Sequence, residues 1–532
     1  MKTQIAKFFA RISRYSMKTI AISLILVLAT IGVFSQPNSP AKIVTVSLPE
    51  KFTTLDTLTS TVSDAAADRI RSLMFNSLVK KDEKLDYVGD LAQEIKTSED
   101  GKIITFVLRG NVKFHNGKIL TSADVKYTFD ELFKSRSYKA GAFFEIVGSG
   151  KVPQIAAIKT PSLKIVNFVL SRASLRRQFL SNLAMIPVIP EGSIARQSAQ
   201  PTGTGPFKFV NFDQIQNFVE FQANSEYFEG SPKIQNILVK TVTDANALQA
   251  ELLNGGVDIA PFPNYLSPDV LKSLGQNPKL KVEQFNGSNI DYLGFNTQSS
   301  VLKNIKIRQA IAYAIDREKI INELLQGQAK IAHSILPIES WAYFEGTKYS
   351  YNPAKAKQLV KESGYRNELI TFKFSAGNAS VSQYAQVIQN SLREIGLNVE
   401  IEVLEPHILR GQLSLGQFQM NTGKWVGGNQ DPIFLKDLFA TDAIPGKKAS
   451  CCNRSRYTNP EFDKIIEESL LTADREKAKV LFAKAQQIVS NDLPLLPLWY
   501  PANIIVSNKR IENIKINPGN DWSFIKDLKV SN

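Results

Sequence analysis

A helix, a glycine and a strand follow one another around residue 396, and this order constrains the fold more than any other feature. Apolar side chains recur first at helical spacing, at Val381, Tyr384, Ala385, Ile388, Leu392 and Ile395. Gly396 ends the helix because glycine adopts positive φ without strain. Apolar and polar residues then alternate as on a half-buried strand, with Leu397, Val399, Ile401 and Val403 on the apolar face. The unit predicts an α/β layered fold.

The same two patterns recur elsewhere in the chain. Residues 43–48 have the alternation and β-branched content of a strand. Asp474 is placed to cap a helix whose apolar face runs to residue 489. With 532 residues at about 100–200 per domain, we expect two or three domains.

The first 35 residues are typical of an export signal. Five basic residues, ending at Lys18, precede a 15-residue apolar run from Ile20 to Phe34, and Pro37 follows. The run is shorter than the ~20 residues that span a bilayer comfortably, so we expect cleavage after Ser35, with an uncleaved anchor as the alternative. Met17 is an alternative start. No cysteine lies near the cleavage site, so a lipid anchor is not expected there, and we place the mature chain in a periplasm.

The sequence lacks the residues that several classes of function require. The two cysteines, Cys451 and Cys452, are neighbours, which leaves a vicinal disulfide or free thiols as alternatives. His115, His333 and His407 are far apart, so neither a metal site nor a cofactor is expected. No nucleophile elbow, phosphate loop or dinucleotide fingerprint occurs, so we expect no catalytic residues and no enzyme. His115 is expected to make a structural hydrogen bond.

The net charge of +14 does not indicate a nucleic-acid partner. Five of these charges lie in the first 35 residues, and beyond them basic and acidic side chains are interleaved. No basic stripe with stacking aromatics is present, so a basic solvated surface is the simpler interpretation.

Six stretches in a fixed order resemble the family 5 bacterial extracellular solute-binding proteins, which serve ABC importers of peptides, nickel chelates and related solutes. They are residues 104–125, 202–207, 227–233, 293–317, 351–356 and 457–463. Each is weak by itself, but together they extend the similarity over about residues 42–505. In the first stretch, Thr121 can cap a helix with Asp124 near its positive end. Arg308, in the fourth, is read as structural.

The resemblance implies a type II periplasmic-binding-protein fold: two α/β lobes that close on a solute, with an extra subdomain inserted in the first lobe. We expect the first lobe at 42–65, 201–288 and 498–532, the inserted subdomain at 66–200, and the second lobe at 289–497. The crossings near Asp291 and Leu498 would form the hinge. Closure would select the form that a membrane permease recognises.

The resemblance also implies where the solute would lie. Similar segments in peptide binders place an aspartate four residues before the proline that corresponds to Pro432, and it pairs with the peptide ammonium. This chain has Gly428 there, which puts peptide specificity in doubt because a charge-assisted hydrogen bond would be missing. The expected ligand-binding residues are Thr61, Ser63, Tyr265, Asn378, Trp425, Gly428, Asn429 and Asp431. Several have structural alternatives: helix capping for Ser63, loop structure for Asn378, core packing for Trp425 and a structural carboxylate for Asp431.

The function expected is therefore capture of peptides or peptide-like solutes by a monomeric periplasmic subunit of an ABC importer, with the inner-membrane permease as partner. A membrane-anchored sensor or adaptor of the same fold is one alternative. An extracellular hydrolase is another, although no nucleophile or metal constellation can be assembled for it. Nickel or haem binding would need a chelate, because histidines are scarce.

Overall fold

The computed structural model describes residues 43–531 apart from residues 53, 57, 148–149, 173–175, 264, 428–429, 447–451, 473 and 520. The side chains of 145–147, 150–151 and 176–178 are also outside the description. Two units are distinguished, Met1–Ile43 and Val44–Asn532. The expected export signal and its alternatives therefore lie outside the described residues. Within the described part, no helix has the length and apolar character of a membrane span.

A seven-stranded mixed sheet has the strand order β10-β11-β12-β1-β13-β21-β14. Its members are β1 (Ile43–Leu48), β10 (Phe207–Asp213), β11 (Phe218–Ala223), β12 (Asn236–Thr241), β13 (Ile259–Pro261), β14 (Leu280–Phe285) and β21 (Asn503–Asn508). β1 and β13 are parallel, with Val46 opposite Ile259. Alternate residues of β13 face different clusters, since Ile259 joins the main core while Ala260 joins a smaller one. The strand predicted at residues 43–48 is confirmed.

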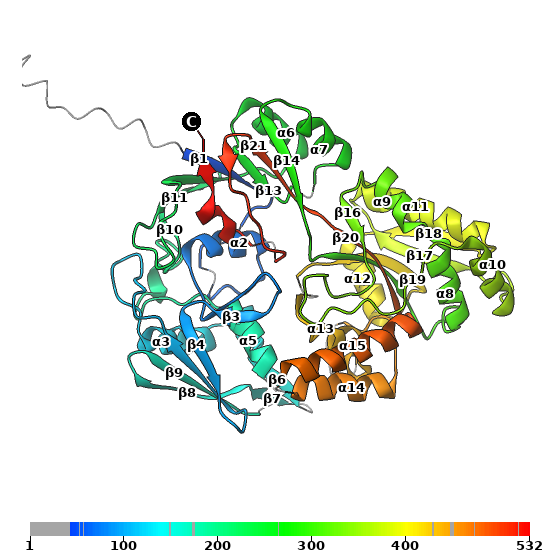
Figure 1. The fold of residues 1–532 in the computed structure, drawn as a ribbon, viewed down its shortest axis with the longest axis horizontal. Helices are drawn as coiled ribbons and strands as arrows, with labels where there is room; N and C mark the ends of the chain where they lie inside the picture. Colours follow the sequence, from blue (N-terminus) through cyan, green and yellow to red (C-terminus); the bar gives the residue numbers. More distant parts are fainter. Residues whose placement is uncertain are drawn as a thin grey trace, which may run out of the picture. The chain divides into compact units, whose positions relative to one another are not determined.

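A six-stranded mixed sheet has the order β16-β20-β15-β19-β17-β18. Its members are β15 (Ile290–Phe295), β16 (Ala329–Ile331), β17 (Ile370–Ser375), β18 (Val399–Leu404), β19 (Met420–Trp425) and β20 (Leu495–Pro501). Every residue of β15 is buried. Tyr292 and Leu293 belong to different apolar clusters, so both faces of the sheet are covered (Figure 1).

A four-stranded antiparallel sheet and three two-stranded pairs complete the strands. The four-stranded sheet consists of β4 (Ala92–Thr97), β5 (Ile103–Leu108), β9 (Ile165–Leu170) and β8 (Ile155–Ser162). The pairs are β2 (Val79–Lys81) with β3 (Tyr87–Gly89), β6 (Phe144–Val147) with β7 (Gly150–Pro153), and β22 (Ile511–Glu512) with β23 (Lys529–Val530). The two large sheets and this third one are the scaffold on which the polar sites are placed.

The α-helices are α2 (Ala65–Met74), α3 (Ser122–Lys134), α4 (Tyr138–Gly141), α5 (Arg176–Ala184), α6 (Ala245–Asn254), α7 (Pro268–Gly275), α8 (Ile305–Ala314), α9 (Arg317–Glu323), α10 (Pro353–Glu362), α11 (Ala379–Glu394), α12 (Pro406–Leu415), α13 (Phe434–Phe439), α14 (Pro460–Leu471) and α15 (Arg475–Asp492). Asp474 caps α15, accepting from the N–H groups of Glu476 and Lys477. Gly396 has φ of 91° after α11, and β18 follows. Both predictions are confirmed.

Two short segments connect the large sheets. The chain leaves β14 at Phe285 and enters β15 at Ile290, and it returns between Pro501 and Asn503. The crossings predicted near Asp291 and Leu498 therefore fall within β15 and β20. At Gly287 the two segments are in close contact, because a Cβ there would overlap the carbonyl oxygen of Pro501.

The glycine-rich stretch 202–207 follows a path fixed by hydrogen bonds to α2 and to His115. Gly205 N–H donates to the carbonyl of Met74 at the end of α2, 2.8 Å away. The His115 ring lies 3.0 Å (Nε2) from the Gly205 oxygen and 3.4 Å (Nδ1) from the Gly203 nitrogen. Nε2 therefore donates and Nδ1 accepts, which fixes the neutral tautomer. The prediction that His115 makes a structural hydrogen bond is confirmed.

We expect the stability to decrease as the pH falls from about 6.5 to 4. Burial lowers the pKa of His115 to about 4, whereas an unfolded histidine titrates near 6.5. The unfolded chain therefore binds more protons in this window, and each proton favours unfolding. Because the His115 side chain is only half-buried, we expect a loss of about 1–2 kcal/mol from this residue.

Urea unfolding at pH 7.5 and 4.5 measures this loss. The variant His115→Gln should lose less stability between the two pH values than the wild type. Some slope should remain, because burial also lowers the pKa of His333 to about 4. His407→Gln, at an exposed position on α12, is the matched control. Equal pH slopes for His115→Gln and wild type would contradict the assignment.

Candidate functional site

The end of β19 forms an aromatic wall. Trp425 stacks on Tyr292 of β15, with ring centroids 5.9 Å apart and planes 15° apart. Phe434 of α13 meets Trp425 edge-on at 5.1 Å. The antiparallel pairing of β15 with β19, which sets Ile290 opposite Trp425, holds the indole in this place. Trp425 is half-buried, so it has both a packing role and an accessible part.

Gln430 connects the segment after β19 to a distant part of the chain. Its amide nitrogen donates to Ser288 Oγ at 2.8 Å, in the first crossing between the sheets. Its amide oxygen accepts from Lys81 Nζ at 2.7 Å, at the end of β2. A side chain between the two sheets thus joins the β2–β3 pair to the six-stranded sheet.

Two carboxylates and a phenol surround the Lys81 ammonium. Burial lowers the pKa of Lys81, while Asp431 and Asp521 act in the opposite direction. The ammonium lies 5.6 Å from the Tyr87 ring centroid. Burial, then the nearby Asp431 carboxylate, raise the pKa of Tyr87 well above its usual value. We call Lys81, Tyr87, Gln430, Asp431 and Asp521 the junction cluster.

Asp431 also organises its own backbone. Its carboxylate accepts from the N–H of Ile433 at 3.0 Å, and its carbonyl accepts from the N–H of Phe434, the first residue of α13. Asp431 is only 9 % exposed, so it is almost completely buried. Asp431 therefore has a structural role at the start of α13 and also belongs to the junction cluster.

Four other residues expected to bind solute lie in other parts of the fold. Thr61 and Ser63 are exposed in the loop before α2, which Asp64 caps. The Tyr265 hydroxyl donates to the carbonyl of Val242 at 2.6 Å. Asn378 caps α11 by accepting from the N–H of Val381. Gly428 and Asn429 lie outside the described residues.

The sequence alone did not identify Lys81, Tyr87, Gln430 or Asp521 as site residues. They occupy positions that are common in any chain: a strand end, a strand start, a loop and a C-terminal turn. Gln430 was the easiest of the four to predict, because it directly precedes Asp431. No local signal could have paired it with Lys81.

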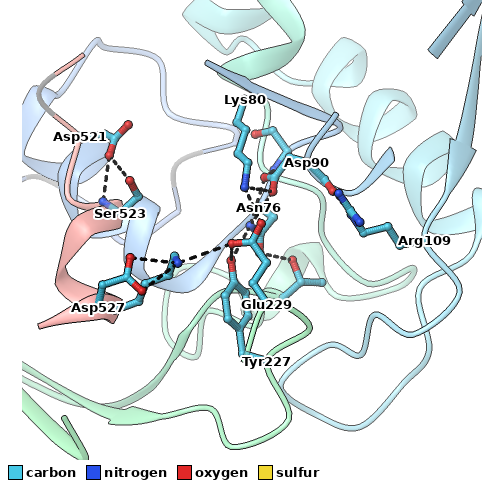
Figure 2. Close-up of polar contacts among 12 residues, drawn as sticks. Asn76, Lys80, Asp90, Arg109, Tyr227, Glu229, Asp521, Ser523 and Asp527 are labelled. Atoms are coloured by element: carbon cyan, nitrogen blue, oxygen red, sulfur yellow. Dashed lines mark hydrogen bonds and ion pairs between the residues drawn. The ribbon is translucent and has the colours of Figure 1, made fainter. Parts of the chain in front are cut away.

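A second polar cluster joins the regions that carry the family-like stretches (Figure 2). Asn76 Nδ2 lies 3.1 and 3.2 Å from the two carboxylate oxygens of Asp90 and 3.2 Å from the Tyr227 hydroxyl. Lys80 Nζ lies 2.5 Å from Glu229 and 3.6 Å from Asp90. We call these five residues the anchor network.

The anchor network is internally satisfied. The Ser77 N–H also donates to Asp90, and the Thr204 hydroxyl donates to the Asn76 amide oxygen at 3.1 Å. Burial raises the pKa of Asp90, and the Lys80 ammonium opposes this shift. Because its polar groups bond one another, the network holds residues 76–109, 204 and 227–229 together rather than presenting groups to a ligand.

Arg308 likewise has a structural role, as predicted. Its guanidinium donates to the backbone carbonyls of Leu302 at 2.7 Å and Leu493 at 3.1 Å. Thr121 and Asp124 form the expected helix start, with the Thr121 N–H 2.9 Å from the Asp124 carboxylate. Cys452 is disulfide-bonded, while Cys451 lies outside the described residues.

The described residues contain no group of three or more histidine, cysteine, aspartate or glutamate side chains arranged to hold a metal ion. Chemically, the junction cluster offers a cation, carboxylates and a phenol beside an aromatic wall. This combination suits non-covalent recognition of a polar solute.

Comparisons with known proteins agree on one family. Residues 86–446 match the model of the bacterial extracellular solute-binding proteins, family 5 Middle. The oligopeptide-binding protein AppA of Bacillus subtilis is 29% identical over 510 residues, covering 91% of each chain. Heme-binding protein A of Haemophilus influenzae is 28% identical over 471 residues, covering 84% of this chain and 85% of its own.

A solved structure shows the same fold. The structure of the Bacillus subtilis oligopeptide-binding protein AppA, in complex with a nonapeptide, superimposes with a TM-score of 0.69 at 26% identity. The match covers 92% of this chain and 99% of that one. The type II periplasmic-binding-protein fold predicted from the sequence is thereby confirmed.

Proposed function

The chain belongs to the bacterial extracellular solute-binding proteins, family 5, and from this we propose that it captures a peptide or peptide-like solute for an ABC importer. Members of this family are binding proteins of the extracellular or periplasmic space. The relatives reported above include one named for oligopeptides and one named for haem. The AppA complex holds a nonapeptide, which favours a peptide as the solute class.

One observation carries the proposal: Lys81 reaches Gln430 beside the aromatic wall, between the two sheets. Two crossings, at residues 286–289 and 502, connect these sheets and can act as a hinge. We propose lobes at 42–65, 201–288 and 498–532, and at 289–497, with the inserted subdomain at 66–200. The boundary between the second lobe and the C-terminal segment of the first lobe is better placed at 502 than at 498, because β20 extends to Pro501.

We further propose that the protein acts as a monomer in the periplasm and delivers its solute to an inner-membrane permease. A closed lobe pair is the form that such a permease would distinguish from the open one. Neither a covalent step nor a nucleic acid is part of this role.

Calorimetry on refolded protein tests the proposal. Denaturation and refolding remove any solute that co-purifies, and mass spectrometry of the released material identifies it. Di-, tri- and longer peptides are then titrated. We expect 1:1 binding with at least one peptide length. Absence of heat with every length, from protein whose circular dichroism spectrum is native, would exclude peptides.

We expect Lys81→Ala to weaken binding of the best peptide about 5-fold. The substitution removes a charge-assisted hydrogen bond that exists only when the two parts of the chain meet, so the bound form loses stability relative to the open form. Lys84→Ala is the control, since Lys84 is exposed and lies in the same hairpin. Calorimetric affinities for both variants measure the effect. Equal affinities for Lys81→Ala and Lys84→Ala would argue against this contact in the bound form.

A further inference from the structure

Arg317 carries a positive charge into the interior beside the six-stranded sheet. It is the first residue of α9 and is only 5% exposed. Its Nη1 donates to the carbonyls of Ala332 at 2.7 Å and Pro497 at 2.8 Å, and its Nη2 donates to the carbonyl of Tyr349 at 3.0 Å. These bonds fix the guanidinium between β20 and the loop that precedes α10.

The charge of Arg317 has no counterion in the described part of the chain. Burial lowers its pKa to about 10, and the one group that opposes this shift is the phenol of Tyr500. That phenol is itself neutral, because burial raises its pKa well above the usual value. A fully buried arginine is almost never found without a paired charge, so a negative partner is missing.

The same guanidinium has two N–H groups to spare. An arginine carries five N–H donors, and the bonds to the three carbonyls use both donors of Nη1 and one of Nη2. The N–H of Nε and the second N–H of Nη2 therefore have no acceptor among the described residues. An occupant that accepts hydrogen bonds and carries a negative charge would satisfy both needs of Arg317.

Arg317 lines a cavity of about 30 Å³, and no aspartate or glutamate lines it. This volume exceeds the roughly 10–15 Å³ that a water-sized occupant requires. Other polar groups in the walls bond within the protein: the Ser334 hydroxyl donates to Gln486 at 2.7 Å, and the Tyr349 hydroxyl donates to the carbonyl of Ser490 at 2.9 Å. The cavity therefore has room for a small ligand beside the spare N–H groups.

His333 lines the same cavity and adds a further donor. Burial, then the charges of Arg317 and Lys348, lower its pKa to about 4, and Glu345 acts in the opposite direction. Lys348 and Glu345 form an ion pair with each other, so the charge of Arg317 remains as the excess. The imidazole is thus neutral near pH 7 and keeps one N–H, for which the described residues supply no acceptor.

We propose that this cavity binds a small monovalent anion of the size of chloride, held by Arg317 and His333. The ion neutralises the buried charge, whereas a water molecule would supply acceptors without charge. The small volume favours a monatomic ion over a carboxylate-bearing solute. No residue of the junction cluster or of the aromatic wall lines the cavity, so the site goes beyond the proposed function and does not depend on it.

Bromide soaking of wild-type crystals tests the site directly. Bromide replaces chloride in sites of this kind and scatters X-rays anomalously, so it is distinguished from water. We expect an anomalous peak within hydrogen-bonding distance of the Arg317 guanidinium. Density in the cavity without an anomalous signal, or an empty cavity, would overturn the proposal. This experiment needs no variant, so a folding defect cannot obscure its result.

Thermal unfolding measures the effect of the ion in solution. Sodium chloride replaces sodium gluconate at constant ionic strength, because gluconate is too large for the cavity. We expect the midpoint to rise by about 1 °C for each tenfold increase in chloride above the dissociation constant. His333→Leu should need more chloride for the same rise, and Arg317→Gln should lose the rise.

Arg308→Gln is the matched control for Arg317→Gln. Arg308 is also 5% exposed and also donates to backbone carbonyls, but Asp492 opposes the lowering of its pKa and it does not line the cavity. The chloride response of this control should equal that of the wild type, which corrects for effects of anions on the whole surface. Equal responses in wild type and Arg317→Gln would overturn the assignment. If Arg317→Gln does not fold, the bromide experiment decides.

Discussion

Gly203→Ala should destabilise the protein by about 3 kcal/mol or more, and it should fold poorly. A Cβ at this position would overlap the carbonyl oxygen of Met74 and lie 2.5 Å from a ring carbon of Phe75. Neither neighbour can move cheaply, since Met74 ends α2 and its oxygen also accepts from the Gly205 N–H. Overpacking against backbone forces a shift of the helix end itself.

Urea denaturation followed by circular dichroism measures this loss. The control is Gly141→Ala, in the short helix α4, where a Cβ would meet nothing within 4 Å. Alanine is the better helix former, so this control should unfold at the same or a slightly higher urea concentration. If both variants unfold at the same midpoint as the wild type, the close approach of residues 202–207 to α2 is not present in solution.

Asp90→Ala should cost about 3–5 kcal/mol of unfolding free energy. Asp90 is 4% exposed, and its carboxylate accepts from Asn76 and from the N–H of Ser77 while facing Lys80. Removing it leaves these donors buried without an acceptor, and a buried donor without a partner keeps its full desolvation cost. Asp90→Asn preserves the shape and some hydrogen bonds, so its loss should be smaller.

The matched control is Asp527→Ala, whose carboxylate pairs with Lys526 at 3.1 Å and is 53% exposed. An exposed pair of this kind contributes about 0–1 kcal/mol. Thermal and urea unfolding of the three variants should therefore rank Asp527→Ala, Asp90→Asn and Asp90→Ala in order of increasing loss. A loss for Asp90→Ala as small as that for Asp527→Ala would mean that the anchor network is solvated.

The anchor network presents no group to a solute, but it joins several regions of the chain (Figure 2). Asn76, Asp90 and Arg109 come from one region of the chain, Tyr227 and Glu229 from another, and Asp527 from the C-terminal segment. The β2–β3 pair that carries Lys81 is attached here through its neighbour Lys80. Loosening this network should therefore also displace Lys81 from Gln430.

Local sequence patterns predicted much of the fold correctly. The strand at 43–48, the α11–Gly396–β18 unit and the capped helix α15 are all found as expected. They were predictable because periodicity, capping and positive φ are properties of a few adjacent residues. Within the candidate site, Trp425 and Asp431 could be proposed because they lie in one short stretch of a recognisable kind.

The sequence by itself therefore determined the family, the α/β class and the local elements of this protein. Only the tertiary structure brought Lys81 to Gln430, across 349 residues, and Arg454 to the face of Trp425. These encounters depend on how two sheets and a loop pack, since a polar side chain carries no local pattern that specifies a distant partner. The chemistry of the site arises from these encounters, because a buried charge or donor acquires its role from the groups that surround it.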